Sequence, residues 1–516
     1  MFSILKLLKR NRNFKYRSSS DLTSPPDTVL INNKLSVNIQ HLNQLFNLTP
    51  DLIIRQIPMD QAGVTAALAY LNGMVDKKSI NNNILSELIH KATDKQSGII
   101  GTVSVGDFRI ETDWNLVEQA ILQGDSVLFI DGEPQVYIFD TKGWPQRAIE
   151  DSHVESSLRG AHQGFAETAS QNIALIRRYI PNRELKIKEQ IVGERGKTKV
   201  SILYLADIVN PEVLKELESR ITRVDVDAIL NTGELAEYIE DNPYTPFPQF
   251  ILTERPDTAA SHILQGRFAV VVDKSPSVLI APAIFVAFFQ SVDDYSSRWQ
   301  IASFIRLLRF FALFIALFLP ATYIALISFN YEVIPLQLIL SIAETRTRVP
   351  FHPIMEAILM ELTLEMMREA GIRLPAPIGQ SIGIVGGIII GQAAVQAGVV
   401  SNIMVIVVAS TAIASFIIPN YDMGASIRLL RFPMMLLASM FGIVGIVCGA
   451  IALVGHFVSL ESLGTPYSSP LAPWRFADMK DVFIRMPLWT MGNRPKGTKS
   501  AQSDKQAGHS PERADP

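Results

Sequence analysis

Long apolar segments occur only after residue 300 of this 516-residue chain, and they divide it into two unlike parts. A helix needs about 20 mostly apolar residues to cross a hydrocarbon layer about 30 Å thick. We expect four such spans, at residues 307–328, 378–395, 400–418 and 432–458. The fold class predicted by this pattern is a soluble α/β head followed by an all-α, multi-pass transmembrane domain over residues 301–460.

The head shows the short alternating elements of an α/β protein, and we divide it into two subdomains, 36–150 and 151–300. In the first, two apolar strands flank Asp131-Gly132, a dipeptide typical of a type I′ hairpin turn. In the second, Asn210-Pro211 predicts the start of a helix that runs to about Arg220. Further strands are expected at Val64–Leu71, Lys186–Val192, Lys199–Leu205, Arg267–Val272 and Val278–Phe285, and helices at Asn83–Lys91 and Ser152–Tyr179.

Both ends of the chain are polar. Six cations and no acid occur between Lys6 and Arg17, so we treat residues 1–35 as a basic arm and linker. Such an arm either binds the anionic lipid of an inner leaflet or is a disordered tail. Beyond the spans we expect a cytoplasmic segment, 461–494, and a disordered tail, 495–516.

Composition narrows the setting of the protein. The formal charge of −3 is too small to favour nucleic acid as a partner, and the single cysteine, Cys448, excludes a disulfide scaffold. The first residues offer too few apolar side chains for a signal peptide, so we expect the head to stay in the cytoplasm. Four crossings would return the carboxyl end to that side but would leave Arg428 and Arg431 outside, so the number of crossings stays open.

Two features of the spans predict how the helices pack. Gly379, Gly383, Gly387 and Gly391 recur every fourth residue and give one helix face without side chains, which lets membrane helices approach closely. Pro320 lies inside the first span, where it removes one backbone hydrogen bond and is expected to bend the helix.

The membrane-associated segment 334–373 carries acids at regular spacing. Glu356 comes first, and Glu361, Glu365 and Glu369 then recur every fourth residue, so we expect these last three on one helix face. Around an axis of subunits these carboxylates would form charged rings that attract cations. The other interpretation is an interfacial amphipathic helix with a solvated acidic face.

Three glutamines in or beside the second span pose a similar choice. Gln380, Gln392 and Gln396 either line a water path or form hydrogen bonds between helices. Together with the four glutamates they are our candidate pore and gating residues.

Motifs of catalysis are missing from the sequence. There is no Gly-x-x-x-x-Gly-Lys-Ser/Thr loop, and the glycines of 383–387 lie in an apolar span rather than after a soluble strand. His153 and His162 have no neighbouring residues at metal-ligand spacing. We therefore expect no enzymatic activity, no cofactor and no metal site.

Several longer motifs resemble those of the A subunit of bacterial spore nutrient-germinant receptors. The resemblance covers about residues 64–495. One departure is Arg159-Gly-Ala-His-Gln-Gly-Phe165, where the family commonly reads Arg-Gly-Pro-Arg-Glu-Gly-Phe, which puts any salt bridge there in doubt. The motifs are Asn172–Arg178, Asp241–Pro248, Phe304–Arg309, Ser415–Tyr421, Arg428–Pro433 and Ser469–Pro473.

The resemblance implies a multi-pass protein of the spore inner membrane, with its head on the core side. It implies a transporter-like B subunit that binds the germinant and a C-subunit lipoprotein as partners, besides membrane lipid. It also implies a homo-oligomeric ring, for which the family suggests a pentamer, that acts as a ligand-gated channel releasing monovalent cations.

Two other functions stay open. A secondary transporter would show two hydrophobic halves that repeat each other, and we see no such repeat, although 334–373 has the character of a re-entrant segment. A non-conducting scaffold subunit would recruit partners through its head while another subunit conducts.

Overall fold

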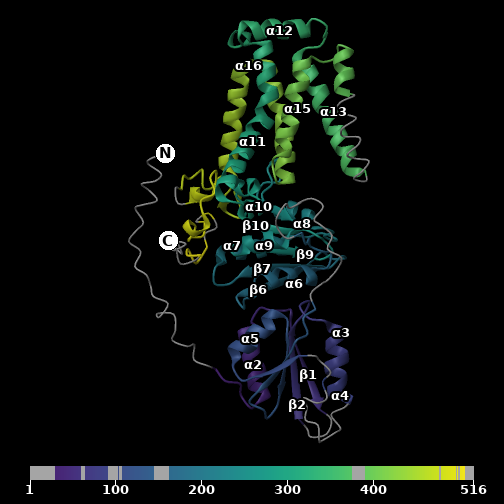
Figure 1. Ribbon diagram of the computed structural model, residues 1–516, viewed down its shortest axis with the longest axis vertical. Helices are drawn as coiled ribbons and strands as arrows, with labels where there is room; N and C mark the ends of the chain where they lie inside the picture. Colours follow the sequence, from purple (N-terminus) through teal and green to yellow (C-terminus); the bar gives the residue numbers. More distant parts are fainter. Residues whose placement is uncertain are drawn as a thin grey trace, which may run out of the picture. The chain divides into compact units, whose positions relative to one another are not determined.

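The computed structural model describes residues 29–59, 64–90, 103, 107–143, 162–374, 390–475, 478–495, 497 and 500–505. The chain divides into two compact units. The first comprises Met1–Asn47 and Asp51–Pro145, and the second comprises Leu48–Pro50 and Gln146–Pro516. Each unit contains one five-stranded sheet, and the second unit also contains the long helices (Figure 1).

The sheet of the first unit is antiparallel throughout, with the strand order β1-β2-β4-β5-β3. Its strands are β1 (Leu52–Met59), β2 (Val64–Leu71), β3 (Phe108–Glu111), β4 (Ser126–Ile130) and β5 (Val136–Phe139). Helices α2 (Leu35–Leu45) and α5 (Trp114–Gln123) cover one face, where Trp114 stacks on Phe129 (Figure 1). The other face packs against α3 (Lys77–Ser79), the π-helix η2 (Ile80–Leu85) and α4 (Ser86–His90).

The sheet of the second unit is also antiparallel, in the order β6-β7-β9-β10-β8. Its strands are β6 (Leu185–Val192), β7 (Thr198–Leu205), β8 (Ile251–Thr253), β9 (Phe268–Val272) and β10 (Val278–Ala281). Helices α6 (Ala169–Tyr179) and α9 (Pro256–Ile263) cover one face. Helices α7 (Pro211–Arg223) and α8 (Thr232–Ile239) cover the other.

The two sheets share one topology. In each sheet, the neighbouring strands are the first, second, fourth, fifth and third along the chain. In each unit, one helix precedes the first strand, and another helix joins the third strand to the fourth. The helices also cover equivalent faces in the two units. This head is therefore a structural repeat.

Buried asparagines mark the repeat at the level of single hydrogen bonds. Asn38 is the fourth residue of α2, and its Nδ2 donates to the backbone oxygen of Asn32 at 2.6 Å. Asn172 is the fourth residue of α6, and its Nδ2 donates to the backbone oxygen of Ala166 at 2.6 Å. Each amide side chain also accepts a backbone N–H from the same loop, so each closes a loop before its helix.

Aspartates repeat in the same way. Asp131 follows β4 and accepts a hydrogen bond from the backbone N–H of Leu35, the first residue of α2, at 2.8 Å. Asp273 follows β9 and accepts one from Ala169, the first residue of α6, at 3.2 Å. A carboxylate at a helix start is favourable because the first N–H groups have no partner within the helix.

The helices of the second unit begin with α10 (Asp293–Ser296) and α11 (Trp299–Ser328), and then come α12 (Leu336–Arg346) and α13 (Pro353–Arg373). Residues 390–396 are helical as well, and α15 (Asn402–Phe416) and α16 (Tyr421–Ser459) complete the set. α11, α13, α15 and α16 run side by side, and α12 lies across one end (Figure 1).

Helix α16 is two helices that meet at Gly442. This residue has φ 62° and ψ −141°, a conformation open mainly to glycine. The chain reverses there, and the close approach of the two limbs shows this. A Cβ on Gly445 would lie 2.1 Å from the backbone oxygen of Leu437, and one on Gly449 would lie 2.6 Å from the sulfur of Met434. The single span expected at 432–458 is therefore wrong: the segment belongs to the two limbs of a helical hairpin.

The C-terminal segment folds back onto the second sheet. It contains β11 (Glu461–Ser462), β12 (Thr465–Pro466) and the short helices η6 (Asp478–Asp481) and η7 (Leu488–Thr490). Ser462 Oγ donates to the backbone oxygen of Gln249 at 2.8 Å, and Ala501 N donates to Ile208 O at 2.7 Å. The second contact differs from the disordered tail that we expected after residue 494.

Strands were predicted better than turns and helix starts. The strand at Val64–Leu71 is confirmed residue for residue, and β6, β7 and the helix capped by Asn210 are confirmed within a few residues. The type I′ turn is wrong, because positive φ occurs at Gly132 but not at Asp131, and five residues separate the strands.

Two predicted helices begin elsewhere. The helix expected at Asn83 begins at Lys77, where Asp76 accepts the capping hydrogen bond from Lys78. The helix expected from Ser152 begins at Ala169, and 152–161 lie outside the described residues. Polar residues beside these segments resembled caps equally well, so sequence alone did not locate the true start.

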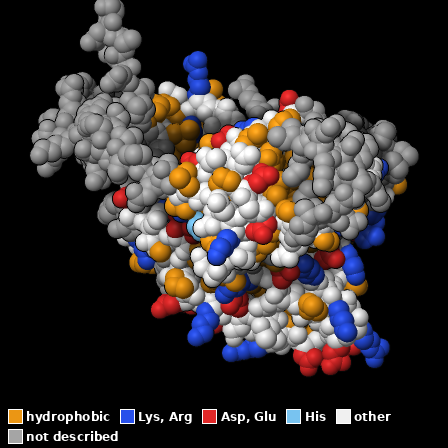
Figure 2. Space-filling view, turned by 90° about the horizontal axis from the view of Figure 1, so that it is seen from below, with side chains coloured by type: hydrophobic (Ala, Val, Ile, Leu, Met, Phe, Trp, Pro, Cys, Tyr) orange, Lys and Arg blue, Asp and Glu red, His pale blue; other side chains and the backbone are white. Residues whose placement is uncertain are grey.

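Charged side chains of both signs are interspersed on the face seen from below, and hydrophobic side chains there form small groups (Figure 2). Such a mixture is typical of a surface in water. The surface of the helices differs from this mixture, because several large apolar side chains of α11, α15 and α16 are exposed, among them Phe311, Ile413 and Val444.

Candidate functional site

Two arginines of α11 are buried at the base of the helices, the end that carries the second sheet. The side chain of Arg306 is fully buried, and its Nε donates to Asp294 Oδ2 at 2.8 Å while Nη1 donates to Asp481 Oδ1 at 2.6 Å. Arg309 Nη1 donates to the same oxygen of Asp294 at 2.8 Å. This cluster, here called the arginine network, joins α10, α11 and η6.

Tyr295 completes the arginine network. Its hydroxyl donates to Asp481 Oδ2 at 2.6 Å, and the guanidinium carbons of Arg306 and Arg485 lie 5.4 Å and 5.5 Å from its ring centroid. Burial, reinforced by the Asp481 carboxylate, raises the pKa of the Tyr295 hydroxyl. The hydroxyl therefore remains a protonated donor to Asp481 across the physiological pH range.

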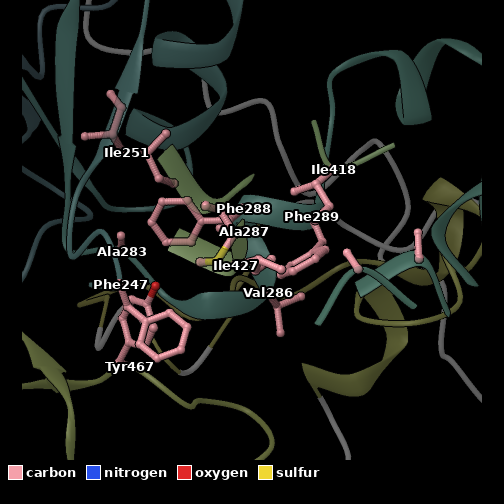
Figure 3. Packing of buried hydrophobic residues seen from close by; sticks show 14 of the residues in the cluster. Phe247, Ile251, Ala283, Val286, Ala287, Phe288, Phe289, Ile418, Ile427 and Tyr467 are labelled. Atoms are coloured by element: carbon pink, nitrogen blue, oxygen red, sulfur yellow. The ribbon is translucent and has the colours of Figure 1, made fainter. Parts of the chain in front are cut away.

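A continuous apolar core lies beside the network. Phe288 and Phe289, in the 3-10 helix η4 (Phe285–Phe289), pack with Ile418 of the loop after α15 and with Ile427 of α16 (Figure 3). Tyr467 of the C-terminal segment joins the same core, and its hydroxyl donates to a backbone oxygen at 2.8 Å. The second sheet, the helix bases and the C-terminal segment thus form one packed body, which is why the predicted second subdomain of the head and the membrane domain fall within one compact unit.

Glu356 and Glu361 lie inside the helical layer of a single chain, with exposed fractions of 1% and 5%. Glu361 forms an ion pair with Arg431, which also donates from Nε to the backbone oxygen of Ala316 at 2.8 Å. Glu356 Oε2 accepts from the backbone N–H of Ser401 at 2.9 Å, at the start of α15. Both acids therefore connect helices of one chain.

Glu365 and Glu369 face more solvent. Glu365 lies 2.7 Å from Arg368 and 3.5 Å from Arg428, and Glu369 lies 2.6 Å from Arg373. A spacing of four residues advances about 40° around a helix of 3.6 residues per turn. The expected common face of Glu361, Glu365 and Glu369 is therefore a row that turns from a buried position to an exposed one.

Arg428 and Arg431 are not stranded at the far end of the helices. Arg428 lies in the first limb of α16 near its start, and Ser426 beside it donates to the backbone oxygen of Pro246, in the loop before β8. The position that four simple crossings gave these arginines is wrong because α13 and α15 both end at the sheet side, so α16 begins there.

The remaining candidates fall into two groups. Gln380, Gly379, Gly383 and Gly387 lie outside the described residues. Gln392 and Gln396 are exposed, and Gly391 is buried beside Val405 of α15. Pro320 is buried within α11, which continues past it to Ser328.

Sequence reasoning missed Asp294 and Asp481 as partners of the arginines. Asp294 precedes the first span and Asp481 follows the last one, and only the fold brings both carboxylates to Arg306. It also missed Gly445 and Gly449, although their spacing of four residues was visible in the sequence. Within the described part of the chain, no group of three or more His, Cys, Asp or Glu side chains is arranged to hold a metal ion.

Residues 40–497 match the model of the Bacillus/Clostridium GerA spore germination protein family. The chain belongs to the GerA family. It is 41% identical to spore germination protein KA of Bacillus subtilis (strain 168) over 474 residues, which are 91% of this chain and 87% of the relative. It is 40% identical to the uncharacterized membrane protein YfkQ of the same organism over 469 residues, 90% of this chain and 91% of the relative.

A crystal structure of the N-terminal domain of the A subunit of the Bacillus megaterium spore germinant receptor GerK3 is also similar to this GerA-family chain. It is 30% identical, with a TM-score of 0.41, and the match covers 50% of this chain and 99% of that one.

Membrane association of the GerA-family chain is supported by α11, which is long and apolar enough to cross a bilayer. It is also supported by α16, which meets the same measure of length and apolar character over its whole extent, although it reverses at Gly442. α15 is apolar but shorter. The relative named as a membrane protein supports the same conclusion.

Proposed function

We propose that this GerA-family chain is the A subunit of a nutrient-germinant receptor and that several copies form a ligand-gated channel for monovalent cations in the spore inner membrane. The observation that carries the proposal is the family match, which begins within α2 and runs through both sheets and the helices that follow. In this proposal a B subunit binds the nutrient, a C-subunit lipoprotein completes the receptor, and the chain has no catalytic role.

The helices support a membrane-embedded oligomer. Their outer surface carries apolar side chains such as Phe311 and Ile413, whereas Glu361 and Arg431 are paired inside one chain. We propose that Glu356 and Glu361 brace the helices, because charges satisfied by one chain are poorly placed to attract ions. Pore lining then falls to the exposed Gln392 and Gln396, with Glu365 and Glu369 as the remaining acids.

The proposed gate moves between two packing arrangements. A nutrient can open it only by binding more tightly to the assembly in its open form. The arginine network and the apolar core tie the second sheet to the bases of α11 and α16, so a displacement of the sheet would be passed to the helices.

The proposal is tested in spores by nutrient-triggered release of K⁺. We expect Gln392→Lys combined with Gln396→Lys to slow the release at least tenfold at normal subunit levels, because two cations would repel K⁺ from the path. Gln56→Lys, at an exposed position of β1, is the matched control and should not change it. Equal rates in both variants would favour a scaffold subunit, and release that requires coupled substrate uptake would favour a transporter.

A further inference from the structure

A cavity of about 460 Å³ lies at the base of the helices, between α9, the segment after η4, and the ends of α13, α15 and α16. Its lining includes four arginines, Arg255, Arg309, Arg368 and Arg428, and one carboxylate, that of Asp293. We propose that this cavity binds a phosphate group, carried either by a soluble phosphate compound or by a phospholipid headgroup.

The helix side of the cavity has more positive than negative charge. Arg368 and Arg428 share one carboxylate, Glu365, at 2.7 Å and 3.5 Å, so their three charges sum to a net positive one. The guanidinium carbons lie 5.2 Å and 5.8 Å from the ring centroids of Phe416 and Tyr421, which hold the two planes in place. Neither Nε makes a hydrogen bond among the described residues, although Nε is the atom of Arg428 that lies 3.5 Å from Glu365.

Guanidinium groups suit this ligand because their fixed N–H donors match the oxygens of a phosphate. Arg368 and Arg428 lie on neighbouring helices and share one carboxylate between two positive charges. They therefore leave N–H donors that a phosphate dianion would satisfy. Aromatic and aliphatic side chains in the same wall would accommodate the apolar part of an ester.

The sheet side adds a neutral donor. His262 of α9 is 9% exposed, and its Nδ1 is buried without a hydrogen-bond partner in the described structure. Burial and the nearby charge of Arg267 lower the pKa of His262 well below its usual value, so the ring is neutral. His262 lines the cavity, and a neutral imidazole carries one N–H that can donate to an oxygen.

Binding there would link the second sheet to three helices. Arg255 and His262 belong to the sheet side, whereas Arg368 and Arg428 belong to the helices. A phosphate held by both sides favours the arrangement in which they are close, and this stabilisation grows with the logarithm of the ligand concentration above Kd. This site does not depend on the channel proposal, because it requires neither conduction nor partner subunits.

The test is calorimetric titration of the purified full chain in a maltoside detergent, which contains no phosphate. The probes are inorganic phosphate and glycerol phosphate, and a parallel arm measures retention of phosphatidylglycerol by native mass spectrometry. We expect saturable binding in at least one arm. Binding of the soluble probes identifies a soluble phosphate as the ligand, and retention of the lipid alone identifies a headgroup.

Variants locate the site. We expect Arg368→Gln and Arg428→Gln to weaken binding at least tenfold, while Arg373→Gln on the same helix, with an exposed side chain, leaves it unchanged. Glu365→Gln should tighten binding severalfold, since it removes the counter-charge, and a merely structural role would not produce that result. Absence of binding in every arm, or equal affinities for Arg368→Gln, Glu365→Gln and Arg373→Gln, would overturn the proposal.

Discussion

At the scale of single residues, charge pairing explains how ionisable groups persist within an apolar helical layer. Arg306 and Arg431 are almost completely buried, and each meets a carboxylate and a backbone oxygen. Removing one partner of such a pair leaves the other charge buried without compensation, which costs more than the pair itself contributes.

Arg306→Met should therefore lower the free energy of unfolding by about 3 kcal/mol, because Asp294 and Asp481 would lose their shared cation. Arg373→Met breaks an exposed pair and should cost less than about 0.5 kcal/mol. Denaturant unfolding of the purified chain in detergent measures both values. Similar values for the two variants would contradict a stabilising arginine network.

Glu240 gives the second sheet a pH dependence. Burial raises its pKa from 4.5 to about 7, a hydrogen bond with Gln249 opposes the rise, and the charges of Glu237 and Asp241 add to it. The folded state thus holds the proton more tightly, so this contribution to stability is complete below pH 4.5 and is lost as the pH rises through 7. Glu240→Gln should flatten the dependence of the unfolding temperature on pH between 5 and 8. An unchanged slope would show that Glu240 titrates normally.

At the scale of elements, two devices shape the chain: a repeated α/β unit and a helical hairpin. The hairpin depends on Gly442, where a Cβ would lie 2.9 Å from the Cβ of Phe329 and 2.8 Å from Oδ1 of Asn330. Asn330 Oδ1 also accepts the backbone N–H of Ile443 at 3.2 Å, so the end of α11 fixes the start of the second limb.

Gly442→Ala should destabilise the helical layer by about 1–3 kcal/mol, because alanine rarely adopts this backbone conformation. Gly455→Ala lies in open space in the second limb and should be neutral or stabilise by up to about 1 kcal/mol. Thermal unfolding in detergent distinguishes them. Equal stability of the two variants would mean that α16 does not reverse at Gly442.

The repeat predicts matched effects in the two units. Asn38→Ala and Asn172→Ala each remove the amide that closes the loop before a helix, and each should cost about 1–3 kcal/mol in its own unit. Hydrogen exchange at α2 and α6 reports the two units separately. Asn82→Ala, an exposed position, should change neither. A large effect from only one of the two buried asparagines would argue against equivalent roles.

Many of the strands and helices could be predicted from the sequence. Apolar runs located most of the strands, because burial on both faces leaves a local signal. The repeat went unnoticed, although Ser36-Val-Asn-Ile39 matches Ser170-Gln-Asn-Ile173 and Asp131-Gly-Glu-Pro134 matches Asp273-Lys-Ser-Pro276. The pairs Arg306–Asp481 and Glu361–Arg431 could not be predicted, since they join residues far apart whose approach depends on the whole path of the chain.

At the scale of the whole molecule, the central claim is that a GerA-family chain combines a duplicated α/β head with helices that conduct cations. The second sheet, the helix bases and the C-terminal segment share one core, so the helices begin and end at the sheet. This arrangement places any signal received by the sheet directly at the base of α11 and α16.

Electrical recording of the purified chain in planar bilayers, alone and with its B and C partners, tests this claim most directly. We predict unitary currents selective for monovalent cations, with Gln392→Lys and Gln396→Lys together shifting the reversal potential toward anions and Gln56→Lys leaving it unchanged. A chain that carries no current in either preparation, or whose selectivity is indifferent to the paired lysines, would contradict the account.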